Sequence, residues 1–314
     1  MIPVNVFLEE LIDYAGLFPP ASLDLDGAIR AFVRHRGSKQ SSALGRFVIP
    51  TGQLEAFSVA AGDLLPPVPE LDASEEDPEP WAVSALVASA ADRAQVEADL
   101  STIEAFNDRH TTVGMGAAIV DTIELKATTG EEIDAVLDML DDEIYPYFEL
   151  DHRGDVRGTI AAIAGLDGGA KVRTGGVTAD AHPTVDQLAD FILACRRADV
   201  PFKATAGLHH PVRAHQESVG TEQFGFLNVF LGAALLHAGV VEEADFRAIL
   251  AEESADAFQH SAETIGWRGR TIDMEQLVAA RSRFGHSFGS CSFDEPMQDL
   301  VTIGWLAESD VEAE

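Results

Sequence analysis

The chain has 314 residues, of which 46% are hydrophobic and 14 are proline. This length and composition can bury a substantial core in one large domain or two modest ones, which excludes disorder and fibrous repeats as its overall description. The 53 acidic and 21 basic side chains give a formal net charge of −32 at pH 7. Such a surface repels nucleic acid and anionic membranes, so we expect neither as a partner.

Residue usage also predicts the environment of the protein. The basic residues are 17 Arg and only four Lys. Together with the acidic excess, this predicts a halophilic protein, because a Debye length of about 3 Å at molar salt screens the self-repulsion. The two cysteines, Cys195 and Cys291, fit a reducing compartment better than a disulfide framework. The N-terminus shows no targeting signal, so we expect the protein in the cytoplasm.

The predicted elements begin with an amphipathic helix over Met1–Asp13, part of an N-terminal helical segment at about residues 1–40. Strand and helix patterns then alternate, with capping boxes at Thr129 and Thr184. An acidic stretch at about residues 66–80 is interpreted as a surface loop. The apolar run Phe224–Val241 is interpreted as a buried helix. One location for this helix is the contact between subunits of a homo-oligomer. The eight strand candidates are residues 46–50, 81–88, 122–127, 145–151, 170–175, 201–207, 257–265 (a weak pattern) and 287–293.

Eight alternations predict an α/β protein with a mainly parallel sheet, because each helix returns the chain to the start of the next strand. Residues 1–314 are therefore expected to form a single (β/α)8 barrel of the TIM type with an N-terminal helix. An open doubly wound parallel sheet is the alternative. The lack of a glycine-rich dinucleotide fingerprint after the first strand makes that alternative less favourable.

Charged side chains occur within strands that should otherwise be continuously apolar. They are spaced two residues apart, which puts both members of a pair on one face of a strand. An unpaired ion under an apolar helix would cost several kcal/mol, so we expect these side chains in the lumen or at its C-terminal mouth, where barrel enzymes keep their active sites. The pairs are Glu124 with Lys126, Glu149 with Asp151, Lys171 with Arg173, and Lys203 with Thr205.

Lysine placement favours function at these positions. Three of the four lysines, all except Lys39, fall in predicted strands. A chain that otherwise prefers Arg has kept Lys where a titratable amine can serve as a Schiff-base nucleophile or move a proton. We expect Lys171 and Lys203 to converge on one central cavity.

Three segments at predicted strand ends supply further candidates. Lys203 is followed by Gly207, which would turn the chain, and by His209 and His210 on the loop above. Arg173 suits a carboxylate or phosphate, and Gly175 and Gly176 let backbone N–H groups approach an anion. The last strand ends in small polar residues around Ser290, where barrels often hold phosphate.

Structural interpretations stay open for several of these residues. The charged side chains of the lumen could form an ion-pair network without a function. His209 and His210 could be metal ligands together with Glu149 and Asp151. Cys291 is interpreted as a small buried residue rather than a nucleophile. The segment Tyr14–Pro20 either closes one end of the barrel or contributes to the site.

The pattern resembles that of barrel lyases, aldolases and isomerases that use lysines at strand ends. It is also similar to the enolase-type barrels, which place Lys on one strand and carboxylates on another. The resemblance implies a reaction style alone.

The leading hypothesis is an enzyme of the lyase, aldolase or isomerase type that acts on a small carbonyl-containing carboxylate or phosphate and requires no cofactor. Lys203 would be the Schiff-base amine or general base, and Lys171, Glu149 or His209 would assist catalysis. One alternative is enolisation assisted by Mg²⁺ or Zn²⁺, and another is a non-catalytic protein that binds small anions. The proposed substrate-binding residues are Lys126, Asp151, Arg173, Gly175, Gly176, Thr205, His210 and Ser290.

Overall fold

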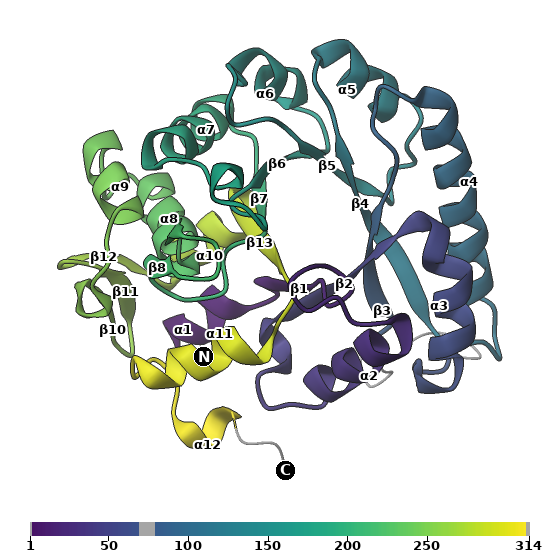
Figure 1. Ribbon diagram of the computed structural model, residues 1–314, viewed down its shortest axis with the longest axis horizontal. Helices are drawn as coiled ribbons and strands as arrows, with labels where there is room; N and C mark the ends of the chain where they lie inside the picture. The colour runs from purple at the N-terminus through teal and green to yellow at the C-terminus, as the bar shows by residue number, and fades with distance from the viewer. Residues whose placement is uncertain (1, 69–78, 312–314) are drawn as a thin grey trace.

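The computed structural model describes residues 2–68 and 79–311, and its centre is a closed barrel of eight strands (Figure 1). All neighbouring strands run parallel, and the last strand pairs with the first. This confirms the predicted (β/α)8 barrel and excludes the open sheet. In order around the barrel, the strands are β1 (Ile12–Tyr14), β2 (Leu44–Pro50), β3 (Trp81–Leu86), β4 (Ala118–Lys126), β5 (Tyr145–Glu149), β6 (Gly169–Arg173), β7 (Phe202–Thr205) and β13 (Gly285–Ser290).

Helices surround the barrel and cover its outer face (Figure 1). Their apolar sides join one continuous core with the outward side chains of the strands. Between β1–β3 and α2 and α3 this core is aromatic, with Phe32 edge-on to both Phe47 and Trp81. The helices are α1 (Pro3–Leu8), α2 (Leu25–Arg36), α3 (Leu54–Ala61), α4 (Arg93–His110), α5 (Gly130–Leu137), α6 (Arg157–Ile163), α7 (Val185–Ala198), α8 (Gly232–His237), α9 (Glu243–Leu250), α10 (Met274–Arg283), α11 (Asp294–Thr302) and α12 (Glu308–Val311).

The first barrel strand was missing from the sequence prediction, which extended the N-terminal helix to Asp13. The helix ends at Leu8, and Glu10 turns the chain with a φ of 47°. Ile12 then pairs with Leu44 of β2 and Phe288 of β13, so the three residues of β1 close the barrel. A strand this short shows no periodicity of its own, and its central aspartate interrupts the apolar pattern.

The predicted strand at residues 257–265 is not part of the barrel. It corresponds to β10 (Phe258–His260) and the start of β11 (Thr264–Trp267), which form an antiparallel sheet with β12 (Arg270–Asp273). Arg268 and Gly269 have φ values of 47° and 78°, and two consecutive left-handed residues form a tight hairpin between β11 and β12. This hairpin sets the antiparallel direction. The predicted number of eight barrel strands was right, but one member was wrong.

The segment between β7 and β13 is much longer than one crossover helix. It includes the hairpin of β8 (Ala214–Gln216) and β9 (Thr221–Gln223), followed by the predicted apolar helix. That helix is buried as predicted, with a π-helical turn over Leu227–Leu231 that continues into α8. Asn228 is fully buried, and its amide donates to the carbonyls of Ile249 and Glu252 while its oxygen accepts from the N–H of Arg213. These bonds satisfy the polar group that interrupts the apolar run.

The capping predictions differ in their outcome. At α7, the Thr184 hydroxyl accepts from the N–H of Gln187, whose side chain accepts from the N–H of Thr184, so the predicted capping box is confirmed. At α5, Thr129 accepts from the N–H of Glu132, but the Glu132 carboxylate accepts from Thr128 instead. The carboxylate thus accepts from the backbone N–H of the residue before the N-cap, and the capping box is not formed.

Two further expectations concern the surface. Most of the predicted acidic loop at about residues 66–80 lies outside the described residues, because positions 69–78 are among those not described. In the described part of the chain, no helix combines the length and hydropathy needed to cross a membrane.

Candidate functional site at the mouth of the barrel

A cavity of about 670 Å³ opens at the C-terminal end of the barrel strands. Its floor contains Glu124 and Lys171, and the loops that follow β1, β6, β7 and β13 form its walls. Active sites of (β/α)8 enzymes lie at this end, because the loops there can vary without disturbing the barrel. The size is within the range of small-molecule pockets.

A ladder of alternating charges crosses the lumen and reaches the floor of this cavity. We call it the lumen ladder; it comprises Asp13, Lys203, Glu124, Lys171, Glu149 and Arg173. Lys203 Nζ lies 2.5 Å from both Asp13 Oδ2 and Glu124 Oε1. Lys171 Nζ lies 2.6 Å from Glu124 Oε2 and 2.8 Å from Glu149 Oε2. Arg173 Nε lies 3.6 Å from Glu149 Oε1. Three carboxylates therefore alternate with three cations, and the ladder has no net charge.

Hydroxyl and backbone N–H groups donate further hydrogen bonds to two carboxylates of the ladder. Ser84 donates to Glu124 Oε1 at 2.8 Å, and Ser287 donates to Asp13 Oδ2 at 2.7 Å. The N–H of Arg46 donates to Asp13 Oδ1 at 2.7 Å. A buried ion pair is stable only when such additional bonds satisfy its remaining lone pairs.

The ladder fixes the protonation of its central members. Burial alone would raise the pKa of Glu124, but Lys171 and Lys203 outweigh it and hold that pKa well below its usual value. Burial opposes the charge of Lys171 too, yet Glu124 and Glu149 raise the pKa of its amine above 10.5. For Glu149, Lys171 and Arg173 likewise outweigh burial and lower the pKa. At neutral pH, Lys171 is therefore an ammonium and both glutamates are carboxylates.

The two lysines converge as the sequence analysis expected, but they differ in access. Lys171 is 5% exposed and lines the cavity. Lys203 has no exposed surface and is not among the lining residues. Its ammonium lies 5.6 Å from the centre of the Tyr147 ring, on the side away from the mouth. Lys171 is thus the amine that a substrate in the cavity can reach.

The second members of the predicted pairs behave differently from one another. Arg173 is the last residue of β6, and its side chain is 47% exposed. Both Arg173 and Thr205, the last residue of β7, line the cavity. Lys126 is exposed at the end of β4, and it is not a lining residue. Asp151 lies beyond β5, where it is exposed and bonded to Arg153 at 2.8 Å. Side chains two residues apart share a face only within a strand, and β5 ends at Glu149, so this spacing does not place Asp151 in the lumen.

Glycines let the loops after β6 and β7 approach each other closely. A Cβ on Gly175 would lie 2.8 Å from Gly207 Cα, and Gly207 has a φ of 77°. The hydroxyl of Thr174 donates to the carbonyl of Ala206 at 2.5 Å, which fastens the same two loops together. Gly175, Gly176 and Gly207 all line the cavity. Their small size makes this wall out of backbone.

The two histidines of the β7 loop also line the cavity, and carboxylates of α11 engage both of them. His210 Nδ1 lies 2.5 Å from Asp299 Oδ2. His209 Nδ1 lies 3.2 Å from Glu295 Oε2, without hydrogen-bond geometry to any described residue. Burial lowers the pKa of His209 although Glu295 acts in the opposite direction, so this ring is neutral at pH 7. Because Nδ1 faces α11, Nε2 is the nitrogen left for a substrate.

The remaining candidates form the rim. Ser290 lines the cavity, and its hydroxyl donates to the carbonyl of Ser292. Cys291 also lines it, and burial raises the pKa of its thiol, in keeping with its interpretation as a small buried residue. Tyr14 is buried in the core, whereas Ala15, Phe18, Pro19 and Pro20 line the cavity, so this segment contributes to the site at the mouth.

The residues proposed as metal ligands do not come together. Among the described residues, no group of three or more His, Cys, Asp or Glu side chains has the arrangement of a metal site. Glu149 is engaged by Lys171, and Asp151 is engaged by Arg153. These donors do not fit a metal as they stand, and metal-assisted enolisation stays a prediction that metal analysis would test.

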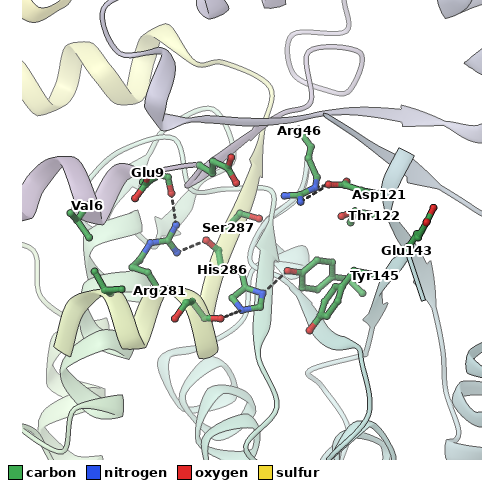
Figure 2. A pocket seen from close by; sticks show the side chains of 14 residues that line it. Val6, Glu9, Arg46, Asp121, Thr122, Glu143, Tyr145, Arg281, His286 and Ser287 are labelled. Carbon is green, nitrogen blue, oxygen red and sulfur yellow. Dashed lines mark hydrogen bonds and ion pairs between the residues drawn. The ribbon is translucent and has the colours of Figure 1, made fainter. Parts of the chain in front are cut away.

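A second cavity, of about 660 Å³, lies at the opposite end of the barrel. Figure 2 shows the side chains that line it. Several of its polar side chains bond to one another and to the backbone. Arg46 holds Asp121 through two bonds of 2.7 and 2.8 Å, and the Tyr147 hydroxyl lies 2.6 Å from His286 Nδ1. Arg281 donates to the carbonyls of Glu9, Gly285 and His286, and only its Nε lacks a partner among the described residues. Burial, reinforced by Arg281, lowers the pKa of His286 to about 4, so the ring is neutral.

We interpret this second cavity as part of the scaffold, because its bonded side chains link the N-terminal parts of β2, β4, β5 and β13. Polar residues at the N-terminal face of such barrels typically contribute to stability, whereas those at the C-terminal face contribute to chemistry. We therefore place the candidate site at the mouth.

Four residues that build the site were not among the site residues proposed from the sequence. Glu124 was noted as one of a pair but not proposed for the site, and it is the centre of the lumen ladder. Asp13 was assigned to a helix, so its position at the seam of the barrel was hidden. Glu295 and Asp299 orient the histidines from α11, and only their spacing on a helix face, four residues apart, could have suggested a shared role.

No protein-family model matches this chain, and no curated protein matches it either.

Proposed function

We propose that the mouth is the active site of an enzyme that acts on a small carbonyl-containing anion by removing a proton next to the carbonyl, in a lyase or isomerase reaction. The observation that carries this proposal is the state of Lys171. It is an ammonium held by two carboxylates on the floor of the cavity, beside an Arg173 that is half exposed.

These groups supply three separate functions. Arg173 binds the anionic group of the substrate through its guanidinium fork. Lys171 donates a hydrogen bond to the carbonyl oxygen, which gains negative charge as the neighbouring carbon loses its proton. His209 is neutral and accepts that proton at Nε2, and Glu295 beside Nδ1 stabilises the imidazolium that results.

This assignment changes the role proposed for Lys203. A Schiff base needs a neutral amine that a substrate can reach. Lys203 has no exposed surface and lies between two carboxylates, so it supports Glu124 from below. Proton abstraction with Lys171 as the oxyanion partner is therefore the version that the geometry favours.

The test is hydrogen exchange in D₂O. The protein is incubated with a panel of 2-oxo acids, and proton NMR follows the loss of signal next to the carbonyl. We expect exchange that falls at least about 100-fold in His209→Gln. Lys126→Met is the matched control, since Lys126 is exposed and lies outside the cavity lining.

Two results would count against the proposal. Exchange unaffected by His209→Gln and by Lys171→Gln would show that these groups do not act on the substrate. Binding of the acids without any turnover would favour the non-catalytic alternative. Borohydride reduction followed by mass spectrometry adds a separate check, because an adduct on Lys203 would restore the Schiff-base version.

We also propose that the protein works in a salt-rich cytoplasm. The support for this is its 53 acidic residues against four lysines, which is the composition that high salt screens.

A further inference from the structure

The mouth cavity is divided by chemistry between two sides of the barrel. The lining residues on β2, on β3 and in the segment after β1 carry no charge and no hydroxyl. The charged lining residues all come from β4, β6 and α11, and the two histidines come from the loop after β7. The apolar set is Ala15, Phe18, Pro19, Pro20, Val48 and Leu86.

This division matters because strands keep their order around a barrel. β1, β2 and β3 are consecutive neighbours, so the segment after β1, Val48 of β2 and Leu86 of β3 form one continuous wall. β6 and β7 are neighbours as well, and they hold Lys171, Arg173 and Thr205. A ligand that reaches Lys171 and Arg173 with its polar end has this wall available for the rest of its body.

The apolar wall disfavours a hydroxyl group on the part of the ligand that lies against it, and the hydroxyl and amide side chains of the lining come from other elements. A hydroxyl pressed onto Val48 or Leu86 would lose its bonds to water without finding a partner. A hydrocarbon group in the same place gains, and each buried methylene strengthens binding by about fourfold.

The cationic side chains that line the cavity suit a ligand with one negative charge. Among the described residues, Lys171 and Arg173 are the Lys and Arg side chains that line the cavity, and two carboxylates already hold Lys171. Glu124 and Glu295 line the same cavity and would repel a dianionic phosphate. A guanidinium with one neighbouring carboxylate, 3.6 Å away, matches a carboxylate better.

We infer that the ligand is a 2-oxo monocarboxylic acid with an aromatic or branched aliphatic side chain. Its carboxylate binds Arg173, its oxo group meets Lys171, and its side chain packs on Phe18, Val48 and Leu86. This assignment of a substrate class rests on the proposed function.

Calorimetric titration of the full chain with four probes tests the inference. The probes are phenylpyruvate, 4-methyl-2-oxopentanoate, pyruvate and ribose 5-phosphate. We expect the first two to bind at least tenfold more tightly than pyruvate, and ribose 5-phosphate to bind most weakly. Arg173→Gln should weaken all three acids, whereas Leu86→Ser should weaken the two large acids and leave pyruvate unchanged. Val59→Ser is the control, because Val59 is 78% exposed on α3 and lines no part of the cavity.

The outcomes separate this inference from the proposed function. Equal binding of pyruvate and phenylpyruvate, tighter binding of ribose 5-phosphate, or no binding of any probe at millimolar concentration would overturn the ligand class. Tight binding of the large acids without hydrogen exchange would support the ligand class and defeat the enzymatic proposal. Hydrogen exchange that occurs only with a phosphorylated or hydroxylated substrate would support the enzymatic proposal and overturn the ligand class.

Discussion

Lys203 joins carboxylates of two strands that are not neighbours, Asp13 of β1 and Glu124 of β4. Each of these carboxylates also accepts a hydroxyl hydrogen bond, from Ser287 and Ser84. Replacing such a network by hydrocarbon can be neutral for stability, but removing one partner leaves the others charged and unpaired. The lumen is therefore sensitive to single substitutions.

Lys203→Met illustrates this sensitivity. The variant leaves Asp13 and part of Glu124 without their cation, so we expect a loss of about 3–5 kcal/mol in the free energy of unfolding, measured by urea denaturation. The control Lys126→Met changes an exposed side chain and should stay within about 0.5 kcal/mol of the parent. A Lys203→Met protein as stable as the parent would show that the ladder contributes nothing at this point.

Glu124 makes the free energy of unfolding depend on pH in the acidic range. Its folded pKa is below the value of about 4.5 that it has when unfolded, so its contribution is complete above pH 4.5 and is lost as the pH falls through the folded pKa. We expect Glu124→Gln to reduce the slope of unfolding free energy against pH below pH 4.5, by up to about 1.4 kcal/mol per pH unit. Identical slopes for parent and variant would contradict the lowered pKa.

At the scale of elements, the sequence predicted best where a pattern had room to repeat. Seven barrel strands coincide with predicted strands, and the capping box of α7 was read from Thr184 and Gln187. The three residues of β1 were too few for a pattern, and the Arg268-Gly269 hairpin that removes β10 and β11 from the barrel was overlooked.

The site follows the same division. Lys171 and Arg173 could be predicted because strand alternation and the barrel mouth fix their direction. The partners of Lys203 and of the histidines could not, since Asp13, Glu295 and Asp299 are far away in sequence. Their contacts depend on how the ends of the chain close the barrel.

The contact between the loops after β6 and β7 leads to a prediction at this scale. Gly207→Ala adds a Cβ 3.0 Å from Gly175 Cα at a residue whose φ is 77°. We expect it to lower the free energy of unfolding by about 1–3 kcal/mol and to weaken ligand binding at the mouth. Thermal unfolding and titration with phenylpyruvate measure the two effects.

Gly62→Ala is the matched control for that substitution. Gly62 has helical dihedral angles at the end of α3, and its Cβ would meet nothing within 4 Å. This variant should be neutral, or more stable by about 0.4–1 kcal/mol. If Gly207→Ala behaved in the same way, the close approach of the two loops would carry no strain.

The whole molecule combines a neutral lumen with a strongly acidic exterior. The lumen ladder balances its own charges, so the net charge of −32 belongs to the rest of the chain. Self-repulsion of the exterior opposes the compact state, and salt relieves it.

This charge predicts a dependence of stability on salt. Raising KCl from 0.1 to 1 M shortens the Debye length from about 10 to 3 Å, and we expect the thermal midpoint to rise with it. Calorimetry in KCl measures the shift, and a midpoint that is constant or falling with salt would contradict the proposed salt-rich environment. The buried pairs of the ladder are screened much less, so Lys203→Met should remain destabilising at both concentrations.

The seam of the barrel has a consequence for synthesis. Asp13 leaves the ribosome long before its bonding partners Lys203 and Ser287, which are 190 and 274 positions later in the chain. At 5–20 residues per second, translation supplies the last of them after about 14–55 s. Throughout that interval β1 has no β13 to pair with, so a nascent chain that stops before residue 285 cannot close the ring.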